Sequence, residues 1–252
     1  MSLQALIFDV DGTLADTERD AHRIAFNAAF AEAGLHWEWN EPLYGELLEV
    51  TGGKERMRFY AERHAPEFLR QADAEARIGE LHAAKTRHYL KLCAVGIPLR
   101  PGVRRLLREA HAAGLRLAIA TTTTPENVDA LLGPELLALF EKVGAGDTAR
   151  RKKPAPDIYL WVLEQLALPA AACLALEDST NGLKASLAAG LATVVIESEY
   201  TRGHDFPGAL AVLSDLGEPD APCTVRRGDM RQKTFVDLEL LEIWHRSIIS
   251  SS

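Results

Sequence analysis

Short apolar runs that alternate with helical patterns indicate an α/β protein. The first run, Leu3 to Val10, is rich in Leu, Ile, Phe and Val and ends at Asp11-Gly12, which is typical of a buried parallel strand that leads into a tight turn. Four later runs each have a helical pattern before or after them, and this alternation predicts βαβ units on a parallel sheet. These runs are Leu115 to Thr121, Lys142 to Ala145, Ala172 to Leu176 and Ala192 to Ile196.

A long helical insertion separates the first predicted strand from the second. About a hundred residues lack any β-type run, and apolar residues follow helical spacing over residues 17–34 and 71–93. We therefore predict a core domain of residues 1–16 and 97–252 and a helical domain of residues 17–96. We expect the chain to pass between the two domains near Ala15 to Thr17 and again at the Pro/Gly-rich segment from Gly96 to Gly102.

The chain after Leu216 has a different character. A polar, proline-bearing tract is followed by a last apolar segment, Phe235 to Ile243. The pattern of this segment fits a docked strand and a docked helix equally well.

Composition and charge narrow the class of protein. The 252 residues are 47% hydrophobic and 25% charged, which is typical of a soluble globular protein, and the formal net charge of −8 opposes binding to nucleic acid or an anionic membrane. The three cysteines form no CxxC pair, so neither a disulfide framework nor a zinc site is expected. Acidic residues within the first 20 positions exclude a secretory signal, and the longest uncharged apolar stretch, Ala185 to Ile196, is too short to cross a bilayer. We expect a cytoplasmic protein with no nucleic-acid or membrane partner.

The sharpest chemical signal is the segment Asp9-Val10-Asp11-Gly12-Thr13-Leu14. It places two carboxylates, two residues apart, at the carboxyl end of a predicted strand, where open α/β sheets bind their ligands. The alternative reading is a turn that only caps the strand.

The motifs of this chain resemble, in order, those of the haloacid dehalogenase superfamily of phosphotransferases, over residues 3 to 216. The DxDx[TV] motif is matched by Asp9 to Thr13, the motif-two Thr by Thr121, the motif-three lysine by Lys153, and the acidic pair by Glu177-Asp178. Taken alone, Lys153 could belong to a solvated basic face and Asp178 to a helix cap. The resemblance implies the haloacid dehalogenase fold, a Rossmann-like sheet core with an inserted α-helical cap.

The resemblance also implies roles for these residues. Asp9 would be the nucleophile that forms an aspartyl-phosphate, and Asp11 the general acid and base. Thr121 and Lys153 would hold the phosphoryl oxygens. Mg²⁺ would be bound by Asp9, the main-chain carbonyl of Asp11, and Asp178, with Glu177 close by.

Further local sequence resembles the CbbY-type sugar-bisphosphate phosphatases, in the segments Asp16 to Glu18, Thr51 to Arg56, His82 to Thr86 and Ala120 to Thr124. This resemblance implies hydrolysis of xylulose-1,5-bisphosphate, an inhibitory by-product of Rubisco in the Calvin cycle, to xylulose 5-phosphate and phosphate. The substrate, a small phosphorylated sugar, would be contacted by Glu18, Tyr44, Gly52, Gly53, Lys54, Arg56, Lys85 and Thr122, besides Asp9, Thr121 and Lys153. We expect a monomer. A β-phosphoglucomutase-like mutase and a catalytically idle interaction protein stay open as alternatives.

Other signals predict no chemistry. Gly52-Gly53-Lys54 lacks the first glycine and the final Ser or Thr of a phosphate-binding P-loop. His82 and His88 lack zinc-protease spacing and are read as helix-surface residues. Trp37, Trp39 and Tyr44 are read as core of the helical domain.

Overall fold

The computed structural model describes residues 2–249, which divide into two compact units. The sheet unit contains the chain up to Asp16, Pro98–Pro125, and the chain from Leu132 onward. The helical unit contains Thr17–Ile97 and Glu126–Leu131. Whether these units fold as separate domains stays a prediction.

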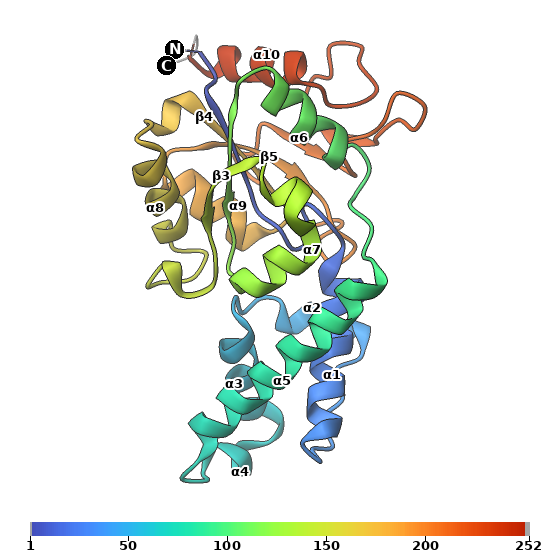
Figure 1. The fold of residues 1–252 in the computed structure, drawn as a ribbon, viewed down its shortest axis with the longest axis vertical. Coiled ribbons are helices and arrows are strands. Elements are labelled where there is room, and N and C mark those ends of the chain that lie inside the picture. Colours follow the sequence, from blue (N-terminus) through green and yellow to red (C-terminus); the bar gives the residue numbers. More distant parts are fainter. Residues whose placement is uncertain (1, 250–252) are drawn as a thin grey trace. The chain divides into compact units, whose positions relative to one another are not determined.

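A seven-stranded sheet forms the centre of the sheet unit (Figure 1). Its strands lie in the order β3-β2-β1-β4-β5-β6-β7, and each pairs parallel with its neighbour except β7, which is antiparallel to β6. The strands are β1 (Ala5–Phe8), β2 (Arg116–Ala120), β3 (Phe140–Gly144), β4 (Cys173–Glu177), β5 (Ala192–Ile196), β6 (Ala211–Leu213) and β7 (Val225–Arg227). The predicted α/β fold with a Rossmann-like parallel core is confirmed. The first five strands follow the five apolar runs, whereas β6 and β7 were not predicted.

The central strand β1 is completely covered. Its residues are at most 1% exposed, because β2 and β4 pair with its two edges and helices cover both faces. This explains its unbroken apolar sequence. The helices of the sheet unit are α6 (Val103–Ala112), α8 (Asp157–Leu166), α9 (Thr180–Ala188) and α10 (Leu238–Ile249), with short 3₁₀ turns η2 (Gly146–Thr148) and η3 (Ala170–Ala172). The ambiguous last apolar segment thus lies mostly in helix α10.

Helix α7 (Pro125–Leu137) belongs to both units. It is interrupted at Gly133, whose φ of 63° is left-handed, and its first part, Glu126–Leu131, groups with the helical unit.

The helical unit is built around aromatic side chains. Trp39 and Tyr44 are completely buried, and Phe26 packs on both with ring centroids 4.7 and 6.3 Å away. The prediction that Trp39 and Tyr44 form core is confirmed, whereas Trp37 is half-buried and packs against Phe30 at 5.3 Å. The elements are η1 (Glu18–His22), α1 (Arg23–Glu32), α2 (Glu41–Leu47), α3 (Gly53–His64), α4 (Pro66–Leu69) and α5 (Ala74–Val95).

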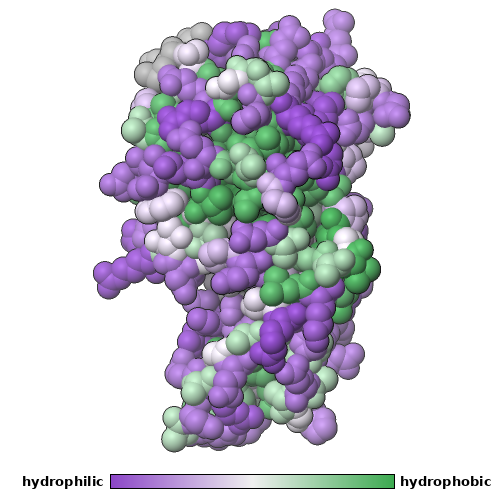
Figure 2. All heavy atoms as spheres, viewed as in Figure 1, coloured by the Kyte–Doolittle hydropathy of each residue, from purple (hydrophilic) through white to green (hydrophobic). Residues whose placement is uncertain are grey.

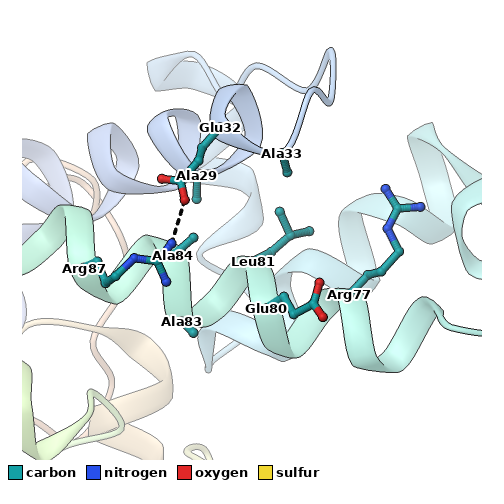
Figure 3. Close-up of a pocket in the computed structure, with 9 residues that line it drawn as sticks. All are labelled: Ala29, Glu32, Ala33, Arg77, Glu80, Leu81, Ala83, Ala84 and Arg87. Carbon is teal, nitrogen blue, oxygen red and sulfur yellow. Dashed lines mark hydrogen bonds and ion pairs between the residues drawn. The ribbon is translucent and has the colours of Figure 1, made fainter.

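A cavity of about 380 Å³ lies between α1 and α5 (Figure 3). Small side chains such as Ala29 and Ala84 line it, and an ion pair of 2.6 Å joins Glu32 to Arg87 beside it. None of the predicted site residues lines this cavity.

The surface matches the composition. On the face drawn in Figure 2 hydrophilic side chains predominate, with hydrophobic side chains in patches between them. Among residues 2–249, no helix is long and apolar enough to cross a membrane.

Candidate active site

The predicted core residues meet at the carboxyl ends of three adjacent strands. Asp9 follows β1, Thr121 follows β2, and Glu177 ends β4. Because β1 lies between β2 and β4, these positions are neighbours. The chain runs from β1 outward to β3 and then returns to β4 on the other side of β1. Such a reversal of strand order opens the crevice in which α/β proteins bind ligands.

Lys153 bridges two carboxylates in this crevice. It comes from the loop before α8, and its Nζ donates to Asp9 Oδ1 and to Glu177 Oε1, both at 2.6 Å. Asp9, Lys153 and Glu177 are 7%, 5% and 0% exposed. Charged hydrogen bonds of this length in a dry environment are among the stronger polar interactions in proteins. Lys153 is therefore a fixed part of the site, and the reading as a solvated basic face is wrong.

Asp178 completes a cluster of carboxylates. One carboxylate oxygen from each of Asp9, Glu177 and Asp178 lies within 4.8 Å of the others, and all three residues are buried. The main chain of the Asp11-Gly12 turn also approaches closely, since a Cβ placed on Gly12 would lie 2.1 Å from Asp178 Oδ2. The left-handed φ of Gly12, +83°, is a second reason for glycine here.

The burial of these charges shifts their pKa values. The pKa of Asp9 is raised from 3.8 to about 8, chiefly because burial disfavours the charged form; Lys153 opposes this, while Glu177 and Asp11 act with it. Burial also raises the pKa of Asp178 well above its ordinary value, together with the charges of Asp9 and Glu177. Burial acts to lower the pKa of Lys153, but its two carboxylate partners outweigh burial and raise it. The negative charges of Asp9, Glu177 and Asp178 are thus only partly balanced by the ammonium group of Lys153.

Two residues that sequence reasoning missed hold Glu177 in place. The hydroxyl of Tyr159, a fully buried residue of α8, donates to Glu177 Oε1. Gly182 of α9 leaves room for the carboxylate, because a Cβ there would lie 1.9 Å from Glu177 Oε2. Tyr159 stands on the apolar face of α8, and neither residue carries a sequence signal that separates it from ordinary core.

Arg100 was also missed, although it fixes the loop that carries Asp11. Its guanidinium donates to the main-chain carbonyls of Gly12, Ile196, Glu197 and Ser214. The residue is only 8% exposed. Asp11 itself is half-buried, and its main chain forms an isolated parallel β-bridge with Ala15.

Thr121 and Thr122 follow β2 directly. The Thr121 main-chain N–H donates to Gly144 O at 2.9 Å, and its Oγ1 accepts from the Thr123 N–H at 3.3 Å. Because the hydroxyl oxygen accepts that bond, its O–H is oriented to donate elsewhere. Thr121 is 1% exposed, and Thr122 is half-buried.

Three of the predicted substrate contacts meet within the helical unit. Tyr44 donates its hydroxyl hydrogen to Glu18 Oε2, and Arg56 Nη1 lies 2.8 Å from the same hydroxyl oxygen and 3.6 Å from Glu18 Oε2. Arg56 is 7% exposed. A buried arginine with a carboxylate partner is a rigid donor rather than a solvated surface charge.

The other predicted contacts of the helical unit lie on α3 and α5. Gly52 is the N-cap of α3 with φ +101°, and Gly53 begins the helix, where N–H groups favour an anion. Lys54 is half-buried, whereas Lys85 is 4% exposed, with Nζ 5.2 Å from the ring centroids of both Phe26 and Tyr89. His82 is half-buried, and its ring stands against Gly53.

The fold and the motif order find a direct match among known proteins. The model of the haloacid dehalogenase-like hydrolases matches residues 3–190. This chain belongs to the haloacid dehalogenase-like hydrolase family. The superfamily predicted from the motifs and the predicted enzyme class, a phosphatase of this superfamily, are therefore confirmed.

Within the family, the chain is similar to CbbY proteins. The plasmid CbbY protein of Cupriavidus necator is 51% identical over 252 residues, covering 98% of each chain. The crystal structure of CbbY from Rhodobacter sphaeroides with phosphate has a TM-score of 0.78 and 44% identity, covering 84% of this chain and 94% of that one. A variant of that CbbY, solved in complex with xylulose-1,5-bisphosphate, has the same TM-score and 43% identity.

Proposed function

We propose that this haloacid dehalogenase-like hydrolase is a Mg²⁺-dependent sugar-bisphosphate phosphatase that converts xylulose-1,5-bisphosphate to xylulose 5-phosphate and phosphate. The observation that carries the proposal is the buried group of Asp9, Lys153, Glu177 and Asp178 at the carboxyl ends of β1 and β4. The substrate assignment is supported by the similar CbbY variant that was solved with this sugar bisphosphate.

The donor set suits a hard divalent cation. Three buried carboxylates share one ammonium group, so negative charge is in excess. The raised pKa values of Asp9 and Asp178 follow from burial together with that excess. Mg²⁺ prefers oxygen ligands and keeps part of its water shell. Asp9, Asp178 and the Asp11 carbonyl would hold it beside Glu177, and it would supply positive charge against the phosphoryl oxygens.

The side chains of the sheet unit divide the reaction into two displacements. Asp9 attacks the phosphorus and forms an aspartyl-phosphate while the bond from phosphorus to the sugar oxygen breaks. Asp11 gives its proton to that leaving oxygen, and then accepts a proton from the water that attacks the aspartyl-phosphate. Phosphate leaves and the Asp9 carboxylate is restored. Lys153 and the Thr121 hydroxyl hold the phosphoryl oxygens during both displacements.

The helical unit would select the substrate through a second phosphate. The buried arginine Arg56 can hold a phosphate through two parallel bonds, and Gly52 and Gly53 present main-chain N–H groups at the start of α3. The energy of binding a phosphate that does not react can be used to orient the one that does.

The proposal is tested by phosphate release with Mg²⁺ from xylulose-1,5-bisphosphate, xylulose 5-phosphate and p-nitrophenyl phosphate. We expect preference for the bisphosphate, reversible loss with a chelator, and no turnover by Asp9→Asn. Arg56→Ala should lower kcat/KM for the bisphosphate about 10- to 100-fold, the worth of a charged hydrogen bond, and leave the aryl phosphate almost unchanged. Arg58→Ala is the matched control, since Arg58 lies on the same helix and pairs with exposed Glu75.

Several results would contradict the proposal. Turnover by pure Asp9→Asn protein would exclude Asp9 as nucleophile. Equal losses on both substrates in Arg56→Ala would exclude a second-phosphate role. Conversion of β-glucose 1-phosphate to glucose 6-phosphate, without net phosphate release, would identify a mutase.

A further inference from the structure

Tyr159 of α8 contacts both members of the ion pair between Lys153 and Glu177. Its hydroxyl donates to Glu177 Oε1, and the same oxygen accepts from Lys153 Nζ at 2.6 Å. Its ring centroid lies 5.1 Å from Lys153 Nζ, within the range of a cation–π contact. Tyr159 is completely buried, so close packing fixes its ring and its hydroxyl beside the ammonium group.

The packing of Tyr159 does not by itself account for the hydroxyl. The ring belongs to a cluster of buried apolar residues that includes Ile7 of β1, Ala118 of β2 and Val162 of α8. A phenylalanine ring would fill the same place in that cluster. The hydroxyl is therefore to be explained by the carboxylate that it contacts.

Lys153 is shared between two carboxylates at equal distances. Its Nζ lies 2.6 Å from Asp9 Oδ1 and 2.6 Å from Glu177 Oε1. Glu177 is 0% exposed and Asp9 is 7% exposed, and the attraction between charges is stronger where water is excluded. Without a further donor, Glu177 would attract the ammonium group more strongly than Asp9 does. The Tyr159 hydroxyl donates to the oxygen that binds the lysine and so takes up part of its charge.

The position of Lys153 Nζ decides what else it can bind. A lysine ammonium group has three N–H donors. Among the described residues, its side-chain hydrogen bonds go to Asp9 and Glu177, which leaves one donor for a phosphoryl oxygen. That donor reaches a phosphoryl group on Asp9 only while Nζ stays beside Asp9.

We propose that Tyr159 is a positioning residue that keeps Lys153 beside Asp9, because its hydroxyl weakens the competing attraction of Glu177. This inference rests on the proposed function, because it treats Lys153 as the group that holds the phosphoryl oxygens. Removing the hydroxyl should let the ammonium group move toward Glu177. A displacement of about 1 Å can cost about 100-fold in rate, and for a smaller displacement we expect a loss of about 10-fold.

The test measures phosphate release by Tyr159→Phe, and its inhibition by inorganic phosphate. The value of kcat/KM should fall about 10-fold for xylulose-1,5-bisphosphate and equally for p-nitrophenyl phosphate, because Lys153 contacts the transferred group of both. Inorganic phosphate should inhibit more weakly, because it binds the same donor. Tyr60→Phe is the matched control, since it removes a hydroxyl in the helical unit, where the Tyr60 ring packs on Trp39 at 5.5 Å. That variant should have native kinetics.

Two further measurements separate positioning of Lys153 from a merely structural role. In the Glu177→Gln background, Tyr159→Phe should add less than about twofold, because the hydroxyl acts through the charge of Glu177. Mn²⁺ binding to the full chain without substrate, followed by electron paramagnetic resonance, should not weaken, because Lys153 and not the cation is displaced. Circular dichroism checks the fold, and Tyr159→Met replaces the phenylalanine variant if that variant does not fold.

Native kcat/KM and native phosphate inhibition in folded Tyr159→Phe would overturn the inference. A loss confined to the bisphosphate, full additivity with Glu177→Gln, or weakened Mn²⁺ binding with native phosphate inhibition would also overturn it. A native chain that releases phosphate from none of the tested substrates would instead refute the proposed function, and the inference with it. The two failures are distinct, because only the second shows in the native chain.

Discussion

Gly182→Ala should detach Glu177 from its partners. The new methyl group would lie 1.9 to 2.3 Å from the three carboxyl atoms of Glu177, so the carboxyl group must move. It is the end of a flexible side chain, but it is completely buried, and Lys153 and Tyr159 both donate to it. The carboxylate therefore cannot move without breaking these bonds.

The expected cost follows from those bonds. A hydrogen bond to a charged group contributes about 1.5 to 3 kcal/mol, and the substitution strains two of them, including the 2.6 Å bond from Lys153. Alanine is favoured over glycine in a helix by up to about 1 kcal/mol, which offsets part of the loss. We expect the free energy of unfolding to fall by roughly 2 to 5 kcal/mol.

Urea unfolding followed by circular dichroism measures this loss, and phosphate release measures the effect on turnover. Gly79→Ala is the matched control, because Gly79 lies inside α5 and a Cβ there would have no neighbour within 4 Å. That variant should be more stable by roughly 0.5 to 1 kcal/mol. If Gly182→Ala is instead as stable as the native protein and its turnover is unchanged, Glu177 does not lie against Gly182 as described.

Three more perturbations test the charges and hydrogen bonds in and around the site. Because the folded pKa of Asp9, about 8, exceeds its unfolded value of 3.8, the chelated protein should lose stability as pH rises through that window. Urea unfolding in chelator at several pH values should show a smaller slope for Asp9→Asn, and an equal slope would contradict the shift. Arg100→Lys should lower stability by about 2 kcal/mol or more in thermal or urea unfolding, because a lysine cannot replace a fork that contacts four carbonyls. Glu177→Gln should slow phosphate release without abolishing it, whereas Asp9→Asn should abolish it.

The sequence predicted the features that depend on local patterns. Strands β1, β2, β4 and β5 were found because each is mostly apolar, and β3 because the short segment Lys142 to Ala145 lies between two helical patterns. The core site residues were found from the order of the family motifs; Asp9, Thr121 and Glu177 lie at strand ends, whereas Lys153 lies in the loop before α8. Strands β6 and β7 were not predicted, because a strand of three residues is too short to show a hydrophobic period. The ambiguity of Phe235 to Ile243 has a similar origin, since only tertiary packing decides between helix and strand in a short apolar run.

Residues that support the site through packing could not be found in this way. Tyr159 reads as one more apolar position of an amphipathic helix, and Gly182 as a small residue near a helix start. Their importance depends on Glu177, which is 18 residues from Tyr159 along the chain. Contacts of this kind follow from the packing of α8 and α9 on the sheet rather than from any motif.

The donors around the two carboxylates that flank Lys153 support the proposal that Asp9, and not Glu177, is the nucleophile. Glu177 accepts from Lys153, from the Tyr159 hydroxyl and, at 3.3 Å, from the Asp178 main-chain N–H. Asp9 accepts from Lys153 through Oδ1. Each donor withdraws charge from a carboxylate and fixes its orientation, so Glu177 is held as a structural partner of the lysine. Asp9 shares the same lysine but, among the described residues, accepts no second side-chain hydrogen bond, and burial raises its pKa to about 8. The different donor sets support the proposed division of roles, with Asp9 as the nucleophile and Glu177 as a fixed partner of Lys153.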